Sequence, residues 1–145
     1  MRIYFSGSMS GGRERAHLYP HIIDQLRKYG EVLTEFVADQ RHSQMGERDV
    51  TPEAVYRRDT DFVNRCDVMV AEVSVPSFGV GVEVAHAGMQ GKPVLALYQP
   101  SAGRRLSAMI AGDPNVTVAE YHSLEEAKKA VEEFFGALGV LSIDD

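Results

Sequence analysis

The stretch from Asp67 to Gly88 constrains the fold more than any other, because it combines three kinds of structure in a fixed order. Val68 to Val73 is a β-branched and apolar run interrupted only by Glu72, a pattern typical of a parallel strand covered on both faces. A loop rich in proline and glycine follows, and small apolar residues from Val80 to Met89 predict a helix that ends at Gly91. The segment therefore predicts a strand, a loop and a helix, with the loop at the ligand crevice of a parallel sheet.

Four other apolar segments predict further strands, with helical patterns between them. They are Arg2 to Ser6, Glu31 to Phe36, Val94 to Tyr98 and Val116 to Glu120. Right-handed crossovers leave few arrangements for five such strands. We therefore expect a single-domain α/β fold over residues 1–145, with a doubly wound five-stranded parallel sheet of the flavodoxin-like or Rossmann-like type.

Four helices besides the one after the third strand are predicted from periodicity and capping signals. In the first, which ends before Gly30, four residues share one face: Tyr19, Ile22, Ile23 and Leu26. Thr51 and Pro52 predict the start of a second helix that runs to Arg65, and a short helical pattern covers Leu106 to Ile110. The last opens with a capping box of Ser123 and Glu126, and its predicted buried stripe is Ala127, Val131, Phe134 and Leu138.

Charge and composition exclude several classes of function. A net charge of −6 argues against a nucleic-acid polymer as partner, because such binding draws mainly on Lys and Arg. The sequence shows neither a signal peptide nor a membrane-spanning run, so a cytoplasmic location and no membrane partner are expected. The single cysteine, Cys66, rules out an internal disulfide and is interpreted as a core residue.

Two neighbouring carboxylates in the helix that starts at Pro52 differ in position. On a helical wheel, Asp59 lies on the side of Val55, Val63 and Cys66, whereas Asp61 lies on the solvated side. A carboxylate among apolar residues must be paired, hydrogen-bonded or functional. Asp59 is thus a candidate for chemistry, and a structural aspartate that pairs with a nearby arginine is an equal alternative.

Glu83 is predicted to lie in the first turn of the helix after the third strand, where the helix dipole favours its anionic form. That position suits a nucleophile or base, although a glutamate at a helix start often has no chemical role. Two carboxylates on separate elements at one crevice are what cleavage of a glycosidic bond requires. Glu72 is a weaker third candidate.

Two glycine-containing loops, 7–13 and 74–81, each precede a predicted helix and could bind phosphate through backbone N–H groups and hydroxyls. Neither is a Walker motif, and no GxGxxG sequence opens the first helix. Candidate positions in and beside them are Ser6, Gly7, Ser8, Gly11, Gly12, Arg13, Ser77 and Gly79.

The histidines do not predict a metal site. His17 and His21 are four residues apart, but Pro20 lies between them and no acidic or cysteine partner is nearby. His86 could line the crevice, although packing or solvation is the more common role. Tyr4 is either a core residue or directs its hydroxyl at a carboxylate.

Four segments together carry a resemblance to a known family: YFSGSMSGGR, RRDTDF, AEVSVPSFGVGVEVA and GRRLSAMIAG. In this order they resemble the 2′-deoxynucleoside 5′-phosphate N-hydrolases, relatives of the nucleoside 2-deoxyribosyltransferases. The resemblance implies a hydrolase that cleaves the N-glycosidic bond of (2′-deoxy)nucleoside 5′-monophosphates. It yields free base and (deoxy)ribose 5-phosphate through a covalent glycosyl-glutamate intermediate, without a metal or organic cofactor.

The same resemblance implies roles for individual residues. Glu83 matches the nucleophile that attacks C1′, Asp59 matches the acid that assists departure of the base, and Tyr4 matches the aromatic hydroxyl beside them. Three residues match positions around the 5′-phosphate: Arg13, Ser77 and Gly79. Ser107 matches a serine that the neighbouring subunit of a homodimer contributes to that phosphate.

This chain departs from the family where it has Phe36 in place of a histidine at the end of the second strand, which leaves the preferred base open. The segment from Val37 to Val50 shows no pattern that could be carried over. Two other functions remain as alternatives, a deoxyribosyltransferase that uses an acceptor base instead of water and a non-catalytic nucleotide-sensing module.

Overall fold

The computed structural model describes residues 1–8, 15–34, 50–100 and 104–144. Five parallel strands form one sheet in the order β2-β1-β3-β4-β5. The strands are β1 (Arg2–Gly7), β2 (Glu31–Val32), β3 (Val68–Glu72), β4 (Val94–Tyr98) and β5 (Val116–Glu120). This is the flavodoxin-like order, and the predicted α/β fold class is confirmed.

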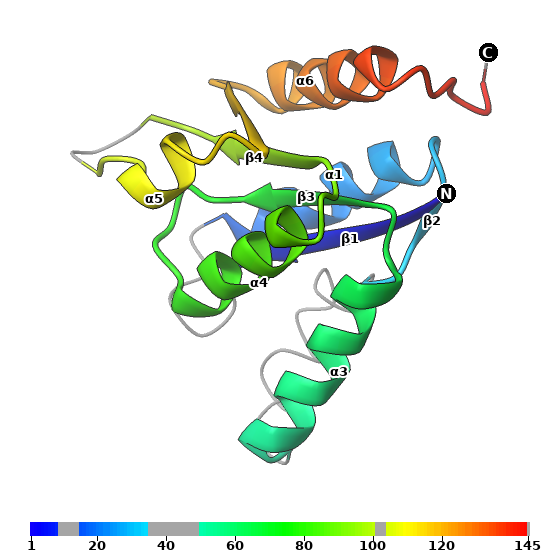
Figure 1. The fold of residues 1–145 in the computed structure, drawn as a ribbon. Coiled ribbons are helices and arrows are strands. Elements are labelled where there is room, and N and C mark those ends of the chain that lie inside the picture. Colours follow the sequence, from blue (N-terminus) through cyan, green and yellow to red (C-terminus); the bar gives the residue numbers. More distant parts are fainter. Residues whose placement is uncertain (9–14, 35–49, 101–103, 145) are drawn as a thin grey trace.

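Helices cover both faces of the sheet (Figure 1). They are η1 (Ala16–Leu18), α1 (Tyr19–Leu26), α3 (Pro52–Arg65), α4 (Phe78–Met89), α5 (Ala108–Ala111) and α6 (Leu124–Ala137). Helices α1 and α6 contact each other on one face, and α3 and α4 contact each other on the opposite face. No helix in the described ranges has the length and apolar character needed to cross a membrane.

The two faces differ in the size of their buried side chains. The α1/α6 face holds several aromatic rings, with Tyr29 and Phe135 stacked at 4.4 Å between centroids. The α3/α4 face is built mainly from valine and alanine, with Tyr4 as one of its few large members. Small side chains on the second face let α4 approach the sheet closely.

The predicted second strand is wrong beyond Val32, because Leu33 and Thr34 form a turn, while residues 35 and 36 lie outside the described ranges. Thr34 is fully buried, and its hydroxyl accepts a hydrogen bond from Phe5 N at 2.8 Å and donates one to Phe5 O at 2.6 Å. The threonine side chain thus satisfies the backbone groups that a longer strand would have paired.

The predicted stripe on α6 is wrong at Leu138, which is 39% exposed. The helix ends at Ala137, and Gly139 follows with a φ of 74°. Phe135 occupies the core instead, and the left-handed Gly139 follows the end of the helix. Smaller differences are that β1 extends to Gly7, α4 begins at Phe78 and α5 covers 108–111 rather than 106–110.

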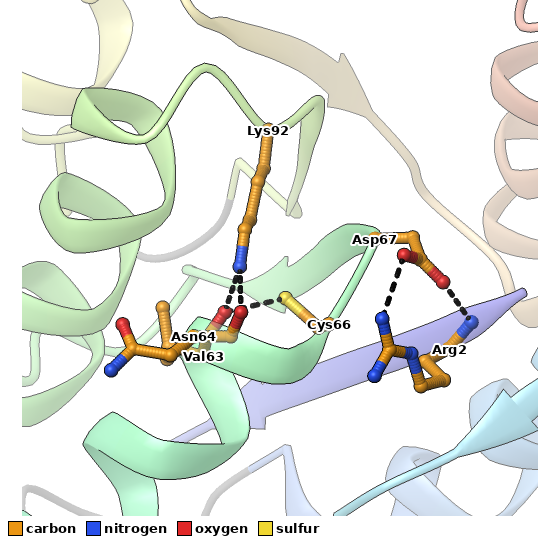
Figure 2. A network of polar contacts seen from close by, with 6 residues as sticks. All are labelled: Arg2, Val63, Asn64, Cys66, Asp67 and Lys92. Carbon is orange, nitrogen blue, oxygen red and sulfur yellow. Dashed lines mark hydrogen bonds and ion pairs between the residues drawn. The ribbon is translucent and has the colours of Figure 1, made fainter.

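Helix α3 is anchored at its C-terminal end (Figure 2). The Lys92 ammonium donates to the carbonyls of Val63 and Asn64, the second at 2.7 Å. Beside it, Arg2 N and the Arg2 guanidinium donate to the Asp67 carboxylate at 2.7 and 3.3 Å. Because Lys92 follows α4, this contact ties the ends of the two helices together while the N-terminal half of α3 extends beyond the sheet (Figure 1).

Candidate active site

A cavity of about 400 Å³ lies between α3 and α4. Its wall includes both carboxylates singled out from the sequence, Asp59 and Glu83. It also includes Val55, Tyr56, Val82 and His86. The fold therefore brings together, in one largely apolar cavity, two acidic groups that are distant in sequence.

Glu83 lies in the second turn of α4 and not in the first, because the helix begins at Phe78 with Ser77 as its N-cap. The expected stabilisation of its anion by the helix dipole is therefore wrong, since that effect is confined to the first turn. Burial, the largest influence, raises the pKa of the Glu83 carboxyl to about 7. The group consequently changes its charge near neutral pH.

Two hydroxyl groups of β1 reach Glu83 from the sheet. Ser6 Oγ donates a hydrogen bond to Glu83 Oε2 at 2.5 Å. The Tyr4 hydroxyl also interacts with this carboxylate, and both interactions favour its ionised form. Burial, followed by the negative charges of Glu83 and Asp59, raises the pKa of the Tyr4 hydroxyl, so Tyr4 remains a proton donor.

The position of Ser6 shows what the residue pattern alone could have revealed. Residues Tyr4 and Ser6 are two apart on a strand, so they share one face. With Glu83 assigned to the same face, Ser6 could have been expected beside it rather than among phosphate-binding groups.

Asp59 pairs with an arginine, as one of the two interpretations of the sequence expects, and it also lines the cavity. Its Oδ1 accepts from Arg58 Nε at 2.9 Å, and the Asp59 side chain remains 20% exposed at the cavity. Asp61, in contrast, is 63% exposed and pairs with Arg65. The predicted separation of these two carboxylates is confirmed.

The two candidate phosphate loops follow β1 and β3, which are neighbouring parallel strands, so their described residues start from the same edge of the sheet. Ser77 Oγ accepts from Val80 N at 3.3 Å, and a Cβ added to Gly79 would meet nothing closer than 3.9 Å.

A Cβ on Gly7 would lie 2.5 Å from the Tyr19 ring, so Gly7 is required for packing. Ser8 is buried and its Oγ has no hydrogen-bond partner within the described structure. Gly11, Gly12 and Arg13 lie outside the described residues, as do Phe36 and the segment 37–49.

Ser107 lies apart from the cavity within this chain. It is exposed at the N-cap of α5, where its Oγ accepts from Met109 N at 3.2 Å. Four large apolar side chains on α4 and α5 are exposed: Phe78 (98%), Val82 (48%), Met89 (85%) and Met109 (85%).

Glu72, the third candidate carboxylate, belongs to a different environment. It is 2% exposed and accepts from Ser74 N at 2.7 Å. Its electrostatic neighbours are Arg15 and Tyr121, and Tyr121 packs in the core of the α1/α6 face. Glu72 therefore does not share the cavity with Glu83.

Within the described ranges, no three His, Cys, Asp or Glu residues are grouped so that they could hold a metal ion. The polar chemistry of the cavity rests on its carboxyl, hydroxyl and imidazole groups.

Comparisons with known proteins show which proteins this chain is similar to. The sequence profile of the nucleoside 2-deoxyribosyltransferase family matches residues 3–132. The 5-hydroxymethyl-dUMP N-hydrolase of Rattus norvegicus is 47% identical over 111 residues, which cover 76% of this chain and 68% of that protein. A putative 2′-deoxynucleoside 5′-phosphate N-hydrolase 1 of Nematostella vectensis is 45% identical over 142 residues, covering 94% and 95%. The chain belongs to the nucleoside 2-deoxyribosyltransferase family.

A solved structure also shares the fold. The CMP N-glycosidase BcmB of Clostridium botulinum superimposes with a TM-score of 0.67 at 20% identity, over 92% of this chain and 99% of that one. The sheet and its covering helices are therefore an arrangement found in other members of the α/β class.

Proposed function

We propose that this protein hydrolyses the N-glycosidic bond of (2′-deoxy)nucleoside 5′-monophosphates, releasing the free base and (deoxy)ribose 5-phosphate. The observation that carries the proposal is the shared cavity of Asp59 and Glu83, with hydroxyl groups of β1 on Glu83. The names of the relatives, N-hydrolases of deoxynucleoside monophosphates, support the same substrate class.

In the first step, the ionised Glu83 carboxylate attacks C1′ of the sugar. The bond between C1′ and the base nitrogen breaks, its electron pair leaves with the base, and Asp59 supplies a proton to the departing base. The product is a glycosyl ester on Glu83. The hydroxyls of Tyr4 and Ser6 hold Glu83 in one orientation during the attack.

In the second step, water attacks C1′ of the ester from the side that the base has left. Asp59, now a carboxylate, takes a proton from this water, and the bond between C1′ and the Glu83 oxygen breaks. The sugar phosphate is released and both carboxyl groups return to their starting states. The largely apolar lining of the cavity limits the access of bulk water.

The 5′-phosphate is assigned to the N-terminus of α4. Free N–H groups at a helix start attract anions, and Ser77 and Gly79 stand there with open space around Gly79. The Ser8 hydroxyl, which is buried and has no partner among the described residues, is a further donor for the phosphate oxygens. Gly7, Gly11, Gly12 and Arg13 belong to the same proposed cradle.

A homodimer completes the proposed site. Ser107 is exposed and is not among the residues that line the cavity of its own chain, and we assign it, as the family resemblance implies, to the phosphate of the neighbouring subunit. The exposed Phe78, Met89 and Met109 supply apolar area for such a contact. Sedimentation equilibrium tests this, and a monomer at the concentrations used for assays would contradict it.

A deoxyribosyltransferase is the second candidate, and the family match favours keeping it. Incubation with a panel of nucleosides and their 5′-monophosphates, with and without an acceptor base, separates the candidates by chromatography. We expect the 5′-monophosphates, and not the unphosphorylated nucleosides, to release free base, with no acceptor base required. Exchange of bases without net hydrolysis would identify a transferase, and binding without either product would identify a sensing module.

A further inference from the structure

Two aromatic side chains lie beside the carboxylates and have no role in the mechanism above. Tyr56 precedes Asp59 by one turn of α3, and His86 follows Glu83 by one turn of α4. Both line the cavity, and their rings meet edge to face with centroids 6.4 Å apart and an interplanar angle of 83°. The cavity is therefore bounded, next to the two carboxylates, by an aromatic pair.

The proposed reaction places the base near this pair. C1′ faces Glu83, and the nitrogen of the leaving base faces Asp59, so the base lies between the two helices. Residues three apart on a helix share one face. Tyr56 therefore borders the same space as Asp59, and His86 borders the same space as Glu83.

The order of residues along α4 agrees with this placement. Gly79 marks the proposed phosphate end, Glu83 the sugar and His86 the base. Seven residue steps separate Gly79 from His86 and span about 10 Å at a rise of about 1.5 Å per residue, which is the length scale of a nucleoside monophosphate.

The chemistry of the pair suits a nucleobase. The Tyr56 residue is 59% exposed although it borders the apolar Val55 and Val82, so a large part of its surface is open to a ligand. Aromatic rings stack on every nucleobase, and the phenol and imidazole groups add hydrogen bonds that distinguish one base edge from another.

We propose that Tyr56 and His86 form the base-recognition subsite and determine which bases are accepted. The proposal rests on the proposed function and adds to it the residues that read the base.

The test uses the full chain and the variants Tyr56→Ala and His86→Ala. Two quantities are compared: kcat/KM for purine and pyrimidine 2′-deoxynucleoside monophosphates, and the inhibition constant of 2-deoxyribose 5-phosphate, which has no base. We expect Tyr56→Ala to lower kcat/KM by roughly tenfold or more. We expect His86→Ala to change the order of preference among bases. Both variants should bind the sugar phosphate like the unmodified protein.

His21→Ala is the matched control, since His21 is an exposed histidine of α1 on the other face of the sheet. It should leave every quantity unchanged. The proposal is overturned if both variants keep the original kcat/KM values and base order, or if sugar-phosphate binding weakens in parallel with turnover. If the unmodified protein releases no base, the proposed function fails. In that case the subsite is still tested by binding: nucleotides and 2-deoxyribose 5-phosphate are titrated separately into the unmodified protein and the two variants, and their affinities are compared.

Discussion

Two glutamates near the carboxyl ends of the strands, Glu72 and Glu83, lie on opposite faces of the sheet and have different surroundings. Glu72 is 2% exposed, with Ser74 N on its carboxylate and Arg15 among its electrostatic neighbours. Glu83 borders the cavity, interacts with the hydroxyls of Ser6 and Tyr4, and has Asp59 and Arg58 as its charged neighbours. Burial raises the pKa of both carboxyl groups. A raised pKa therefore does not by itself distinguish a catalytic carboxylate from a structural one, whereas access to the cavity does.

The contacts of Glu72 explain its structural role. Ser74, which Glu72 binds, in turn accepts a hydrogen bond from Gln99 N at 2.8 Å. Glu72 thus fixes the loop between β3 and α4 and links it to the end of β4. Glu72, on the α1/α6 face, thus holds the loop that leads into α4, whereas the cavity itself lies on the α3/α4 face.

Neutralising each glutamate in turn should give the largest difference in activity. Glu83→Gln should lower release of free base by on the order of 10³-fold or more, since the amide is a poor nucleophile. Glu72→Gln, the matched control, keeps an acceptor for Ser74 N and should stay within about tenfold of the original rate. Chromatography of the released base measures both, and equal losses would remove the distinction.

A second pair of variants compares the two aspartates of α3. Asp59→Asn should lower the rate by roughly 10²- to 10⁴-fold, the usual contribution of a general acid or base. The loss should be smaller for 5-fluorouracil as leaving group, because that base needs less protonation. Asp61→Asn, at the 63% exposed neighbour, should have little effect. An identical loss for both leaving groups would contradict the role of Asp59 as acid.

The pH profile of kcat/KM tests the ionisation of Glu83. A nucleophilic carboxylate must be ionised, so kcat/KM should rise about tenfold per pH unit up to about pH 7, where the Glu83 pKa lies. Ser6→Ala removes a hydrogen bond that favours the ionised form, so the midpoint should move to higher pH. A profile that is flat below pH 7, or a midpoint that moves down in the variant, would contradict this assignment.

The smallest expected effect concerns stability. Glu72→Ala leaves Ser74 N without its acceptor, which should lower the free energy of unfolding by about 1–3 kcal/mol. Glu83→Ala removes a poorly solvated charge and should cost less than about 1 kcal/mol at pH 8. Urea denaturation of both variants gives the comparison, and a larger loss for Glu83→Ala would reverse it.

The sequence predicts most of the fold because its strongest signals are local. The strands β4 and β5 begin and end where apolar runs do, and Thr51 caps α3 as expected, accepting from Ala54 N at 3.2 Å. The length of β2 could not be predicted, because Thr34 competes for the backbone of β1 through its side chain. A tertiary contact of this kind leaves no periodic pattern.

The candidate site was predictable as a set of residues but not as an arrangement. Periodicity placed Asp59 on the inner side of its helix, and the glycine loop located the start of α4 approximately. The helix begins two residues earlier than the sequence predicts, which moves Glu83 from the first turn to the second, beyond the turn where the helix dipole acts. The contacts of Ser6 and of His86 arise only when β1, α3 and α4 are packed together.

The proposed mechanism depends on a covalent bond between Glu83 and the sugar. Asp59→Asn should slow the attack of water on the glycosyl ester of Glu83. When this variant is incubated with 5-fluoro-2′-deoxyuridine 5′-monophosphate, the ester should therefore accumulate. Mass spectrometry of the denatured protein should show the added mass of one deoxyribosyl 5-phosphate, located on the peptide that contains Glu83. Release of base and sugar phosphate in equal amounts, from a protein whose mass never changes, would contradict the account.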